Sequence, residues 1–389
     1  MRKRVESLSL PFDQSSLRRR DHPLPLAQVK PNGFPESSFH ALNNSTITTA
    51  DHPTAKNSIG LSIEANDVGY LAEIYIGTPP KKFRVILDSG SADTWCRNSK
   101  NPALGCNHPA LNVDSSTLHI TDTKFNVSYG TGNVQGLLVQ EDITIGGLLL
   151  QHHTFGGVTS ASNEFAGSTI PFDGLMGTAK SSLSSQKVIT PIEAMAKAGI
   201  ISGAFIGYSL GRVSDNQNIG QATFGGVDQT KFSGNLTMFP NVNKKGFWEG
   251  EMASIMVDGQ VVLRQRTGIL DTGTTLIVAP PADAQALHAH IPGASSDGKG
   301  GFFIPCTSKA KVALSFGGVP FEINPVDLTF QPTTTDLSAN CISAISSGTV
   351  GGPNQWLLGD TFLKNVYFAT DATHDEMGMA ALKKVSSKG

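Results

Sequence analysis

Val85-Ile-Leu-Asp88-Ser-Gly-Ser91 recurs as Gly268-Ile-Leu-Asp271-Thr-Gly-Thr274, in which the second aspartate lies 183 positions after the first. In each copy apolar residues precede an aspartate, which is followed by a hydroxyl residue, a glycine and a second hydroxyl residue. A further pair of matching segments follows at nearly the same distance. The glycine of Leu175-Met-Gly177 lies 89 residues after the first aspartate, and that of Leu357-Leu-Gly359 lies 88 residues after the second. Because both the aspartate motif and the segment that follows it recur at matching spacing, the sequence predicts two lobes of one design.

The rest of the chain is typical of an all-β protein. Short runs that alternate in polarity or are rich in β-branched residues are separated by glycine-bearing turns. Strands are therefore expected near residues 71–76, 83–87, 118–121, 125–129, 142–145, 205–208 and 255–257. Two segments that follow proline and consist of strong helix formers predict helices at 192–199 and 282–290.

Composition excludes several classes of protein. The chain has 389 residues, of which only 16% are charged, while 41 are glycine and 21 are proline. These values argue against coiled coils and helical bundles. The net charge of -2 supplies no basic surface for nucleic acid, and no stretch is long and apolar enough to span a membrane. Nucleic acid is therefore not an expected partner.

Charge divides the chain into a leader and a main body. Residues 1–56 hold 8 Lys and Arg against 5 Asp and Glu, whereas residues 57–389 hold 22 against 27. The first 57 residues are rich in Pro, Ser, Arg and His and show no sustained periodicity, so they predict a removable leader or, equally on composition, a disordered tail. The predicted organisation is a leader over residues 1–57, a first lobe over 58–235 and a second lobe over 236–389.

The paired aspartates indicate a specific chemistry. An aspartate followed by Ser or Thr and then Gly is held in a tight turn whose N–H groups and hydroxyls can bond the acid. If two such turns meet about a pseudo-twofold axis, the carboxyl groups of Asp88 and Asp271 cannot both ionise easily, and one proton is shared. The ionised member can then take a proton from water while the protonated member donates to a substrate carbonyl, which predicts amide hydrolysis at acidic pH.

At this point the sequence resembles the pepsin-like aspartic endopeptidases, of fungal type and in zymogen form, from about Gly69 to Leu382. The resemblance implies an all-β, bilobal fold of two pseudo-twofold-related, barrel-like lobes with a central cleft and a flap hairpin. It implies that Asp88 and Asp271 are catalytic, and that the other residues of their turns support the pair, namely Ser89, Gly90, Ser91, Thr272, Gly273 and Thr274.

Val127-Ser-Tyr129-Gly130-Thr131-Gly132 resembles the flap of this family. The resemblance assigns Tyr129, with Gly130 and Thr131, to closing over the substrate, and Trp95 to holding that tyrosine through its indole N–H. Some fungal members carry Asp in the flap and accept lysine at the scissile bond. Because this chain has Thr131 instead, we expect cleavage between bulky apolar residues. A further departure, Asp-Ser-Gly in place of the commoner Asp-Thr-Gly, retains the hydroxyl and is expected to tune activity.

The four cysteines fall into two pairs that are close in the sequence, Cys96 with Cys106 and Cys306 with Cys341. Neither spacing fits a zinc or redox motif. The residues alone leave two local disulfides and four buried thiols as alternatives. The resemblance implies that both pairs are disulfides. It also implies that the basic leader crosses the acidic cleft as an inhibitor, with Lys30 as a candidate for meeting the aspartates and the activation cut between about Thr49 and Asn66.

Two other functions compete with this hypothesis. Gly207-Tyr-Ser209-Leu-Gly211 satisfies the G-x-S-x-G pattern of a serine hydrolase, but that motif must join a strand to a helix and the following residues indicate a loop. A catalytically inactive binding or inhibitory module is the second alternative, although such relatives usually lose an aspartate or the flap tyrosine.

Histidine pairs at 152–153 and 288/290 lack a third ligand at metal-binding spacing, so surface placement is expected for them and no metal or cofactor is predicted. The expected partners are protein and peptide substrates, and the expected state is a monomer. Cysteine pairing and acid chemistry predict an extracellular or vacuolar location, although no signal peptide is visible at the start of the sequence.

Overall fold

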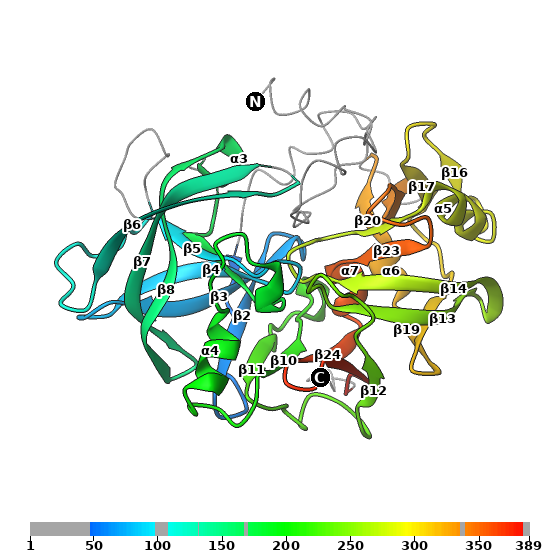
Figure 1. Ribbon diagram of the computed structural model, residues 1–389. Helices are drawn as coiled ribbons and strands as arrows, with labels where there is room; N and C mark the ends of the chain where they lie inside the picture. Colours follow the sequence, from blue (N-terminus) through cyan, green and yellow to red (C-terminus); the bar gives the residue numbers. More distant parts are fainter. Residues whose placement is uncertain (1–46, 98–107, 131, 167–169, 335–338, 384–389) are drawn as a thin grey trace.

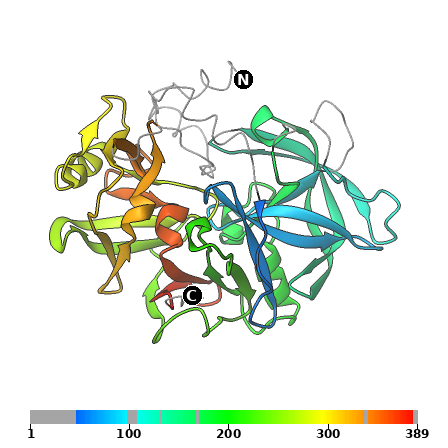
Figure 2. The same cartoon turned by 180° about the vertical axis from the view of Figure 1, so that it is seen from behind.

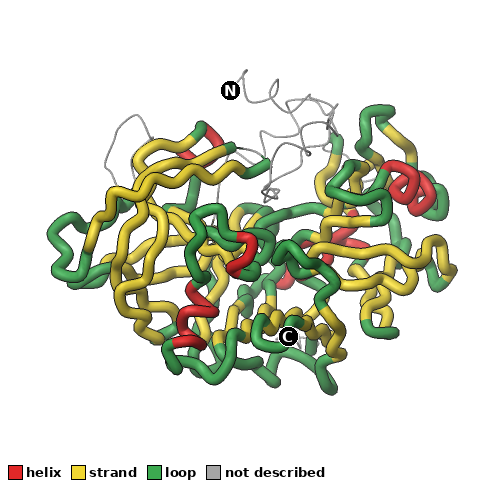
Figure 3. The backbone as a smooth tube through the Cα atoms, in the orientation of Figure 1, coloured by secondary structure: helices red, strands yellow, loops and turns green. Residues whose placement is uncertain are grey.

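The structure is a computed structural model and describes residues 47–97, 108–130, 132–166, 170–334 and 339–383. It is built mainly from β-strands with a few short helices, as Figure 3 shows. The all-β prediction is therefore confirmed, and strands or helices lie at each of the positions where the sequence predicted them.

Six strands close into a barrel in the first half of the chain, on the left in Figure 1. They follow one another in the order β3, β4, β9, β5, β8, β7, and β7 returns to β3 through the pairing of Tyr75 with Thr144 and Ile76 with Ile143. The strands of this half are β2 (Ser58–Glu64), β3 (Gly69–Ile76), β4 (Lys81–Asp88), β5 (Thr94–Arg97), β6 (His119–Ser128), β7 (Asn133–Ile145), β8 (Leu148–Ala161) and β9 (Gly174–Gly177).

The second half, on the right in Figure 1, repeats the strand pairing of the first. In the first half β4 pairs in parallel with β9, which pairs antiparallel with β5, which pairs in parallel with β8. The same alternation joins β14 to β23, β15 and β22. The strands of this sheet are β13 (Glu249–Val257), β14 (Gln260–Leu270), β15 (Ile277–Ala279), β18 (Val312–Phe316), β19 (Val319–Ile323), β22 (Ile345–Ser347) and β23 (Gln355–Leu358). The two halves whose sequence motifs repeat therefore also share this pattern of strand pairing.

A third group of strands lies low between the two halves in Figures 1 and 2, where β24 and β25 are red. It brings together residues from both ends of the chain, because β10 pairs with β24 and β11 pairs with β2. Its members are β10 (Phe205–Ser209), β11 (Gln221–Phe224), β12 (Thr237–Pro240), β24 (Val366–Asp371) and β25 (Glu376–Ala381), while β1 (Ile47–Thr48) pairs with β2.

The helices are short and begin at proline in three cases, where the fixed backbone angle of proline suits the first helical turn. They are α3 (Asn163–Ala166), α4 (Pro191–Lys197), α5 (Pro281–His288), α6 (Pro325–Leu328) and α7 (Asp360–Leu363), with 3₁₀ turns at Ser181–Leu183 and Val213–Asp215. No helix in the described ranges is long and apolar enough to cross a membrane.

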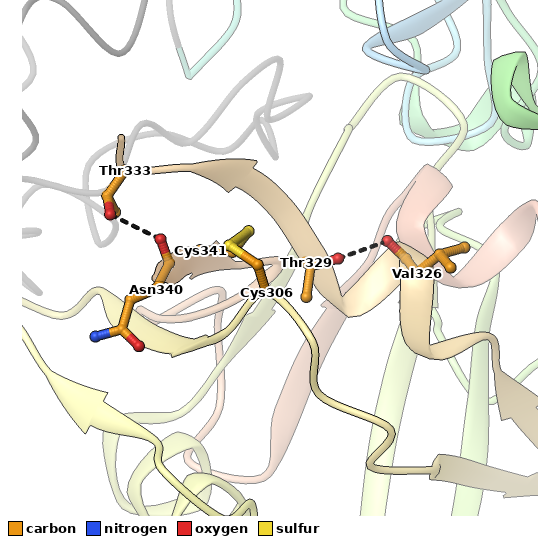
Figure 4. The surroundings of a disulfide bond; sticks show 6 residues. All are labelled: Cys306, Val326, Thr329, Thr333, Asn340 and Cys341. Atoms are coloured by element: carbon orange, nitrogen blue, oxygen red, sulfur yellow. Dashed lines mark hydrogen bonds between the residues drawn. A yellow bond between two sulfur atoms is a disulfide. The ribbon is translucent and has the colours of Figure 1, made fainter. Parts of the chain in front are cut away.

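A small four-stranded sheet carries a disulfide between Cys306 and Cys341 (Figure 4). Cys306 follows β17 and Cys341 lies on β21, and the two Cα atoms are 4.8 Å apart. This predicted bond is confirmed. The strands of this sheet are β16 (Ser295–Ser296), β17 (Phe302–Pro305), β20 (Thr329–Pro332) and β21 (Asn340–Ser343).

The other predicted disulfide is not formed, because Cys96 is a free thiol. Cys96 lies on β5 between β8 and β9, and its fully buried side chain packs in the core beside Gly174. Burial raises the pKa of this thiol well above its ordinary value. Its predicted partner, Cys106, lies outside the described residues.

The expectation that the four histidines lie on the surface is wrong for two of them. His152 and His290 are exposed, whereas His153 and His288 point inward and are buried. On β8 adjacent side chains alternate between the two faces, so one of two neighbouring histidines must enter the core. Burial lowers the pKa of His153 to about 4 and that of His288 to about 4.

The buried histidine on β8 should make stability depend on pH. Burial favours the neutral form of His153 in the folded state. The contribution of His153 to the free energy of unfolding is therefore fully present above its unfolded pKa of about 6.5, and it is lost as the pH falls toward about 4. Replacing His153 with Gln should therefore lessen the fall in unfolding free energy over that range by up to about 3 kcal/mol. Urea unfolding at several pH values measures this, with the exposed neighbour variant His152→Gln as control. Equal pH dependence in the His153 variant and the wild type would contradict the prediction.

Candidate active site

The two repeated aspartates occupy the same position in the two halves. Asp88 is the last residue of β4 and pairs with Gly177 of β9, and Asp271 follows β14 and donates its N–H to the carbonyl of Leu358 on β23 at 3.0 Å. Both aspartates are essentially excluded from solvent, with 0% and 1% exposure. The parallel strand beside each aspartate fixes the start of the turn that follows it.

The turns of the two halves interlock through hydrogen bonds that cross from one to the other. The N–H of Ser89 donates to the hydroxyl of Thr272 at 3.0 Å, and the N–H of Thr272 donates to the hydroxyl of Ser89 at 2.9 Å. Each hydroxyl then donates to a carbonyl of the opposite strand, that of Leu270 at 2.8 Å for Ser89 and that of Leu87 at 2.6 Å for Thr272. The halves are therefore joined by four buried bonds between residues next to the two aspartates.

Each carboxyl group is also held by its own turn. The N–H of Gly90 donates to Oδ1 of Asp88 at 2.8 Å, and the hydroxyl of Ser91 donates to Oδ2. In the second half the N–H of Gly273 donates to Oδ1 of Asp271 at 2.8 Å, and the hydroxyl of Thr274 donates to Oδ2 at 2.6 Å. The six turn residues predicted to support the pair are thus brought together around it.

The glycines of the two turns allow the carboxyl groups to meet. A Cβ atom placed on Gly90 would lie 2.3 Å from the carboxyl carbon of Asp271, and one placed on Gly273 would lie 2.4 Å from Oδ1 of Asp88. Each glycine therefore packs against the acid of the opposite half, where no side chain fits.

The two acids interact electrostatically. Burial raises the pKa of Asp88 well above its ordinary value, and the nearby charge of Asp271 and a side-chain hydrogen bond with it raise this pKa further, while bonds from Ser91 and Gly90 oppose the shift. Two carboxyl groups this close in a buried site favour a state in which they share one proton.

The predicted flap is a hairpin between β6 and β7, in which the N–H of Tyr129 donates to the carbonyl of Gly132 at 2.6 Å. The ring of Tyr129 is buried, and its hydroxyl accepts a hydrogen bond from the indole N–H of Trp95 at 2.7 Å. Gly130 is exposed at the turn, and Thr131 lies outside the described residues.

Phe165, on α3, completes this aromatic cluster and was missed from the sequence. Its ring centroid lies 5.6 Å from that of Trp95 and 5.2 Å from that of Tyr129, both in edge-on geometry. Such contacts add to the stabilisation from burial alone. No local motif distinguishes Phe165 from an ordinary core residue.

We expect the hydrogen bond between Trp95 and Tyr129 to contribute more to the rate of turnover than to the free energy of unfolding. Replacing Trp95 with Phe keeps a buried aromatic ring but removes the donor, leaving the tyrosine hydroxyl without this partner. We expect kcat/KM for peptide cleavage to fall about 10-fold, which corresponds to one lost bond of about 1.4 kcal/mol. Trp248→Phe, which loses an indole bond to the carbonyl of Thr178 instead, is the comparison variant. An unchanged kcat/KM for Trp95→Phe would contradict the assignment of this bond to the site.

A buried ion cluster of Lys364, Asp67, Asp327 and Arg212 was also missed from the sequence. The ammonium group of Lys364 contacts a carboxyl oxygen of Asp67 at 2.9 Å and one of Asp327 at 3.2 Å. The guanidinium of Arg212 grips Asp327 through contacts of 2.6 to 3.2 Å and also bonds Asn365. The four charged residues lie far apart in the sequence, so no local signal could have joined them.

Ser209 does not occupy a nucleophile elbow. It is the last residue of β10, it is buried, and it is followed by the 3₁₀ turn at Val213–Asp215 rather than by an α-helix. This agrees with its interpretation as an ordinary strand residue.

One group of possible metal ligands is present in the described part of the chain, at Asp371, His374 and Glu376. Asp371 accepts the N–H groups of Thr373 and His374 and bonds the ring of His374 at 2.6 Å. These bonds form the turn between β24 and β25, so we assign the group a structural role. None of the histidines considered from the sequence belongs to it.

Comparison with known proteins adds an independent finding. The family model described as eukaryotic aspartyl protease matches residues 69–382. Among curated proteins, the chain is 36% identical to the probable aspartic-type endopeptidase CTSD of Arthroderma benhamiae, over 90% of this chain and 68% of that protein. It is 32% identical to rhizopuspepsin of Rhizopus chinensis, over 84% and 82% of the two chains. It is 31% identical to the vacuolar aspartic protease of Candida albicans, over 81% and 75%.

Proposed function

Because the chain belongs to the eukaryotic aspartyl protease family and is an aspartic-type endopeptidase, we propose that Asp88 and Asp271 are its catalytic pair and act on a water molecule in acidic solution. The observation that carries this proposal is the cross-packing of the two turns, in which each glycine lies against the carboxyl group of the other half.

The proposed reaction needs one ionised and one protonated carboxyl group. The ionised member takes a proton from water as the water oxygen bonds to the substrate carbonyl carbon, and the protonated member donates to the carbonyl oxygen. Collapse of this intermediate breaks the C–N bond, and a proton passes to the leaving amine. The bonds to Gly90, Ser91, Gly273 and Thr274 support the proposal, because they hold both acids in one geometry before substrate arrives.

For substrate preference we propose cleavage between bulky apolar residues. The apolar surroundings of the flap tyrosine support this preference, since Tyr129, Trp95 and Phe165 pack as one aromatic cluster. We assign Tyr129 and Gly130 to closing over the substrate with Thr131, and Trp95 to orienting the tyrosine.

The remaining features of the family-based hypothesis stay proposals. We propose that residues 1–57 are an inhibitory prosegment, that the lobes divide near residue 235, and that the monomeric enzyme works outside the cell or in a vacuole. A relative named as a vacuolar protease supports the last point. The opposite charges of the leader and the body support the inhibitory role, because protonation of carboxylates at low pH weakens their attraction.

Digestion of casein or haemoglobin at pH 3 to 4 tests the proposed function. We expect cleavage that pepstatin abolishes and that phenylmethylsulfonyl fluoride does not affect. Sensitivity to the sulfonyl fluoride alone would instead indicate Ser209, and a folded protein without activity at any pH would indicate a binding module.

A further inference from the structure

The surface loop before β12 carries an acceptor pattern for N-linked sugar. Asn235-Leu-Thr237 matches Asn-x-Ser/Thr, in which the side-chain amide of the asparagine is modified in proteins that enter the secretory route. Asn235 is exposed and lies two residues before the start of β12 at Thr237. The asparagine therefore lies where a transferase and a bulky sugar can reach it.

The chain on both sides of Asn235 is held by β25. The N–H of Ser233 donates to the carbonyl of Ala381 at 2.9 Å, and Thr237 pairs with Met379. A sugar attached to Asn235 would therefore start from a fixed place at the edge of the sheet.

An apolar hollow lies beside this loop. Its volume is about 390 Å³, within the range of roughly 300 to 1,000 Å³ that is usual for pockets that hold small molecules. Leu236 and Met238 line it, and both side chains lie over Gly378 of β25. A Cβ atom placed on that glycine would be 3.3 Å from a methyl carbon of Leu236 and 2.7 Å from the sulfur of Met238. The residues next to the acceptor therefore form part of the wall of the hollow.

Much of this apolar lining is left uncovered by the described part of the chain. Met238 is 39% exposed, and Phe205, Val227 and Leu236 are only half-buried. Exposed apolar surface of this kind usually marks a contact site. In addition, β12 is the edge strand of its sheet, a position that proteins commonly protect from pairing with other chains. A group that covers this surface is therefore expected to stabilise the fold.

We propose that Asn235 is N-glycosylated and that the first N-acetylglucosamine of its glycan lies against Leu236 and Met238 at the mouth of the hollow. The C–H groups of the sugar ring cover the apolar side chains, while its hydroxyl groups remain in water. Thr373 and His374 also line the hollow, so polar partners for the sugar are close by. This inference goes beyond the proposed catalysis and rests on the proposed location outside the cell or in a vacuole.

The modification is a group transfer from a lipid-linked oligosaccharide diphosphate, which the secretory route of a eukaryotic cell supplies together with the transferase. A bond forms between Nδ2 of Asn235 and C1 of the first N-acetylglucosamine, and the bond between C1 and the diphosphate oxygen breaks. The lipid diphosphate leaves with the electron pair, and Nδ2 loses one proton. No oxidation or reduction takes place.

The proposed sugar site is remote from the flap. Figure 1 shows β12 at the bottom of the molecule and α3 at the top, where Phe165 of α3 contacts the flap tyrosine. The glycan is therefore expected to act on stability.

A second acceptor pattern in the described residues, Asn126-Val-Ser128, offers a matched comparison. Asn126 is exposed on β6 and pairs with Gln135 of β7. Lys124 and Ser128, which share its face of the strand, are exposed and polar, and none of these residues lines the hollow. A sugar on Asn126 would therefore have no apolar wall to cover.

The test secretes the full chain from a yeast host behind an added export signal and measures sugar on Asn235 by peptide mapping with mass spectrometry. The glycan is then trimmed by endoglycosidase H, which leaves the first N-acetylglucosamine, or by peptide N-glycosidase, which removes that sugar too. We expect the thermal midpoint of unfolding to be kept after the first enzyme and to fall by about 2 °C or more after the second.

Three variants complete the test. Asn235→Gln should show the same fall in the midpoint as full removal of the glycan. Thr237→Val destroys the acceptor pattern but keeps Asn235 and the shape of the side chain at 237, so it should show the same fall. Asn126→Gln should leave the midpoint unchanged.

Three results would overturn the inference. They are the absence of sugar on Asn235 in the secreted protein, equal midpoints for the glycosylated protein and both variants at the acceptor pattern, and a loss that is already complete after endoglycosidase H. Sugar occupancy and midpoints are also measured on the Asp271→Asn protein, so that the test does not depend on catalysis. A glycosylated and stabilised chain that cleaves no peptide would reject the proposed catalysis alone, and an active chain without this sugar would reject the present inference alone.

Discussion

Replacing Asp271 with Asn should reduce kcat/KM by about 10⁴-fold or more while leaving the fold intact. The amide cannot take a proton from water or share one with Asp88, and loss of a group that acts as one unit with its partner removes most of the catalysis. Asn is nearly the same shape, so it still offers an oxygen to the N–H of Gly273 and fits against Gly90. Peptide cleavage at pH 4 measures the loss, with near-ultraviolet circular dichroism as the check on folding.

Asp88→Asn should behave in the same way, because the proposed chemistry needs both members. The exposed variant Asp258→Asn serves as the matched control for the purification and the assay. Residual activity must be compared with that of a preparation titrated with pepstatin, so that traces of wild-type enzyme are recognised. Turnover within 10-fold of wild type in either catalytic variant would disprove the assignment.

The second large effect concerns stability. Replacing Lys364 with Met should lower the free energy of unfolding near pH 5 by about 3 to 5 kcal/mol, because it leaves Asp67 and Asp327 without their shared cation in a buried site. Methionine has a similar length, so the loss of stability reflects the missing charge more than a change in side-chain volume. Urea unfolding followed by tryptophan fluorescence measures it.

Two further variants give this prediction its controls. Lys311→Met breaks an exposed pair with Glu322 and should cost less than about 1 kcal/mol. Adding Asp67→Asn to Lys364→Met should recover part of the lost stability, because it removes one of the stranded charges. A cost of less than 1 kcal/mol for Lys364→Met would show that the cluster does not stabilise the fold.

The two aspartate turns could be predicted from the sequence because their hydrogen bonds are local. An apolar strand, an aspartate, a hydroxyl residue and a glycine specify a turn in which the acid is held by its own neighbours, as the bonds around Asp88 and Asp271 show. The matched spacing to Gly177 and Gly359 predicted two lobes of one design, whereas the parallel strand beside each turn is known only from the structure.

The residues that were missed depend on contacts between distant parts of the chain. Lys364 and Asp67 contact each other although they are 297 positions apart in the sequence. Lysine and aspartate usually lie on the surface of proteins, so nothing in the sequence indicated a buried pair. Asp360 stands in a recognisable segment, but only the three-dimensional packing shows that its side chain is buried. The resemblance predicts a bond between Cys96 and Cys106, whereas Cys96 lies buried on a central strand as a free thiol.

The most direct test of the paired carboxyl groups is a crystal structure of the activated enzyme with pepstatin, whose hydroxyl-bearing tetrahedral carbon imitates the intermediate of amide hydrolysis. The account predicts that the hydroxyl oxygen lies within about 3 Å of a carboxyl oxygen of Asp88 and, at the same time, of one of Asp271. An inhibitor bound elsewhere, or one that contacts only a single aspartate, would contradict it.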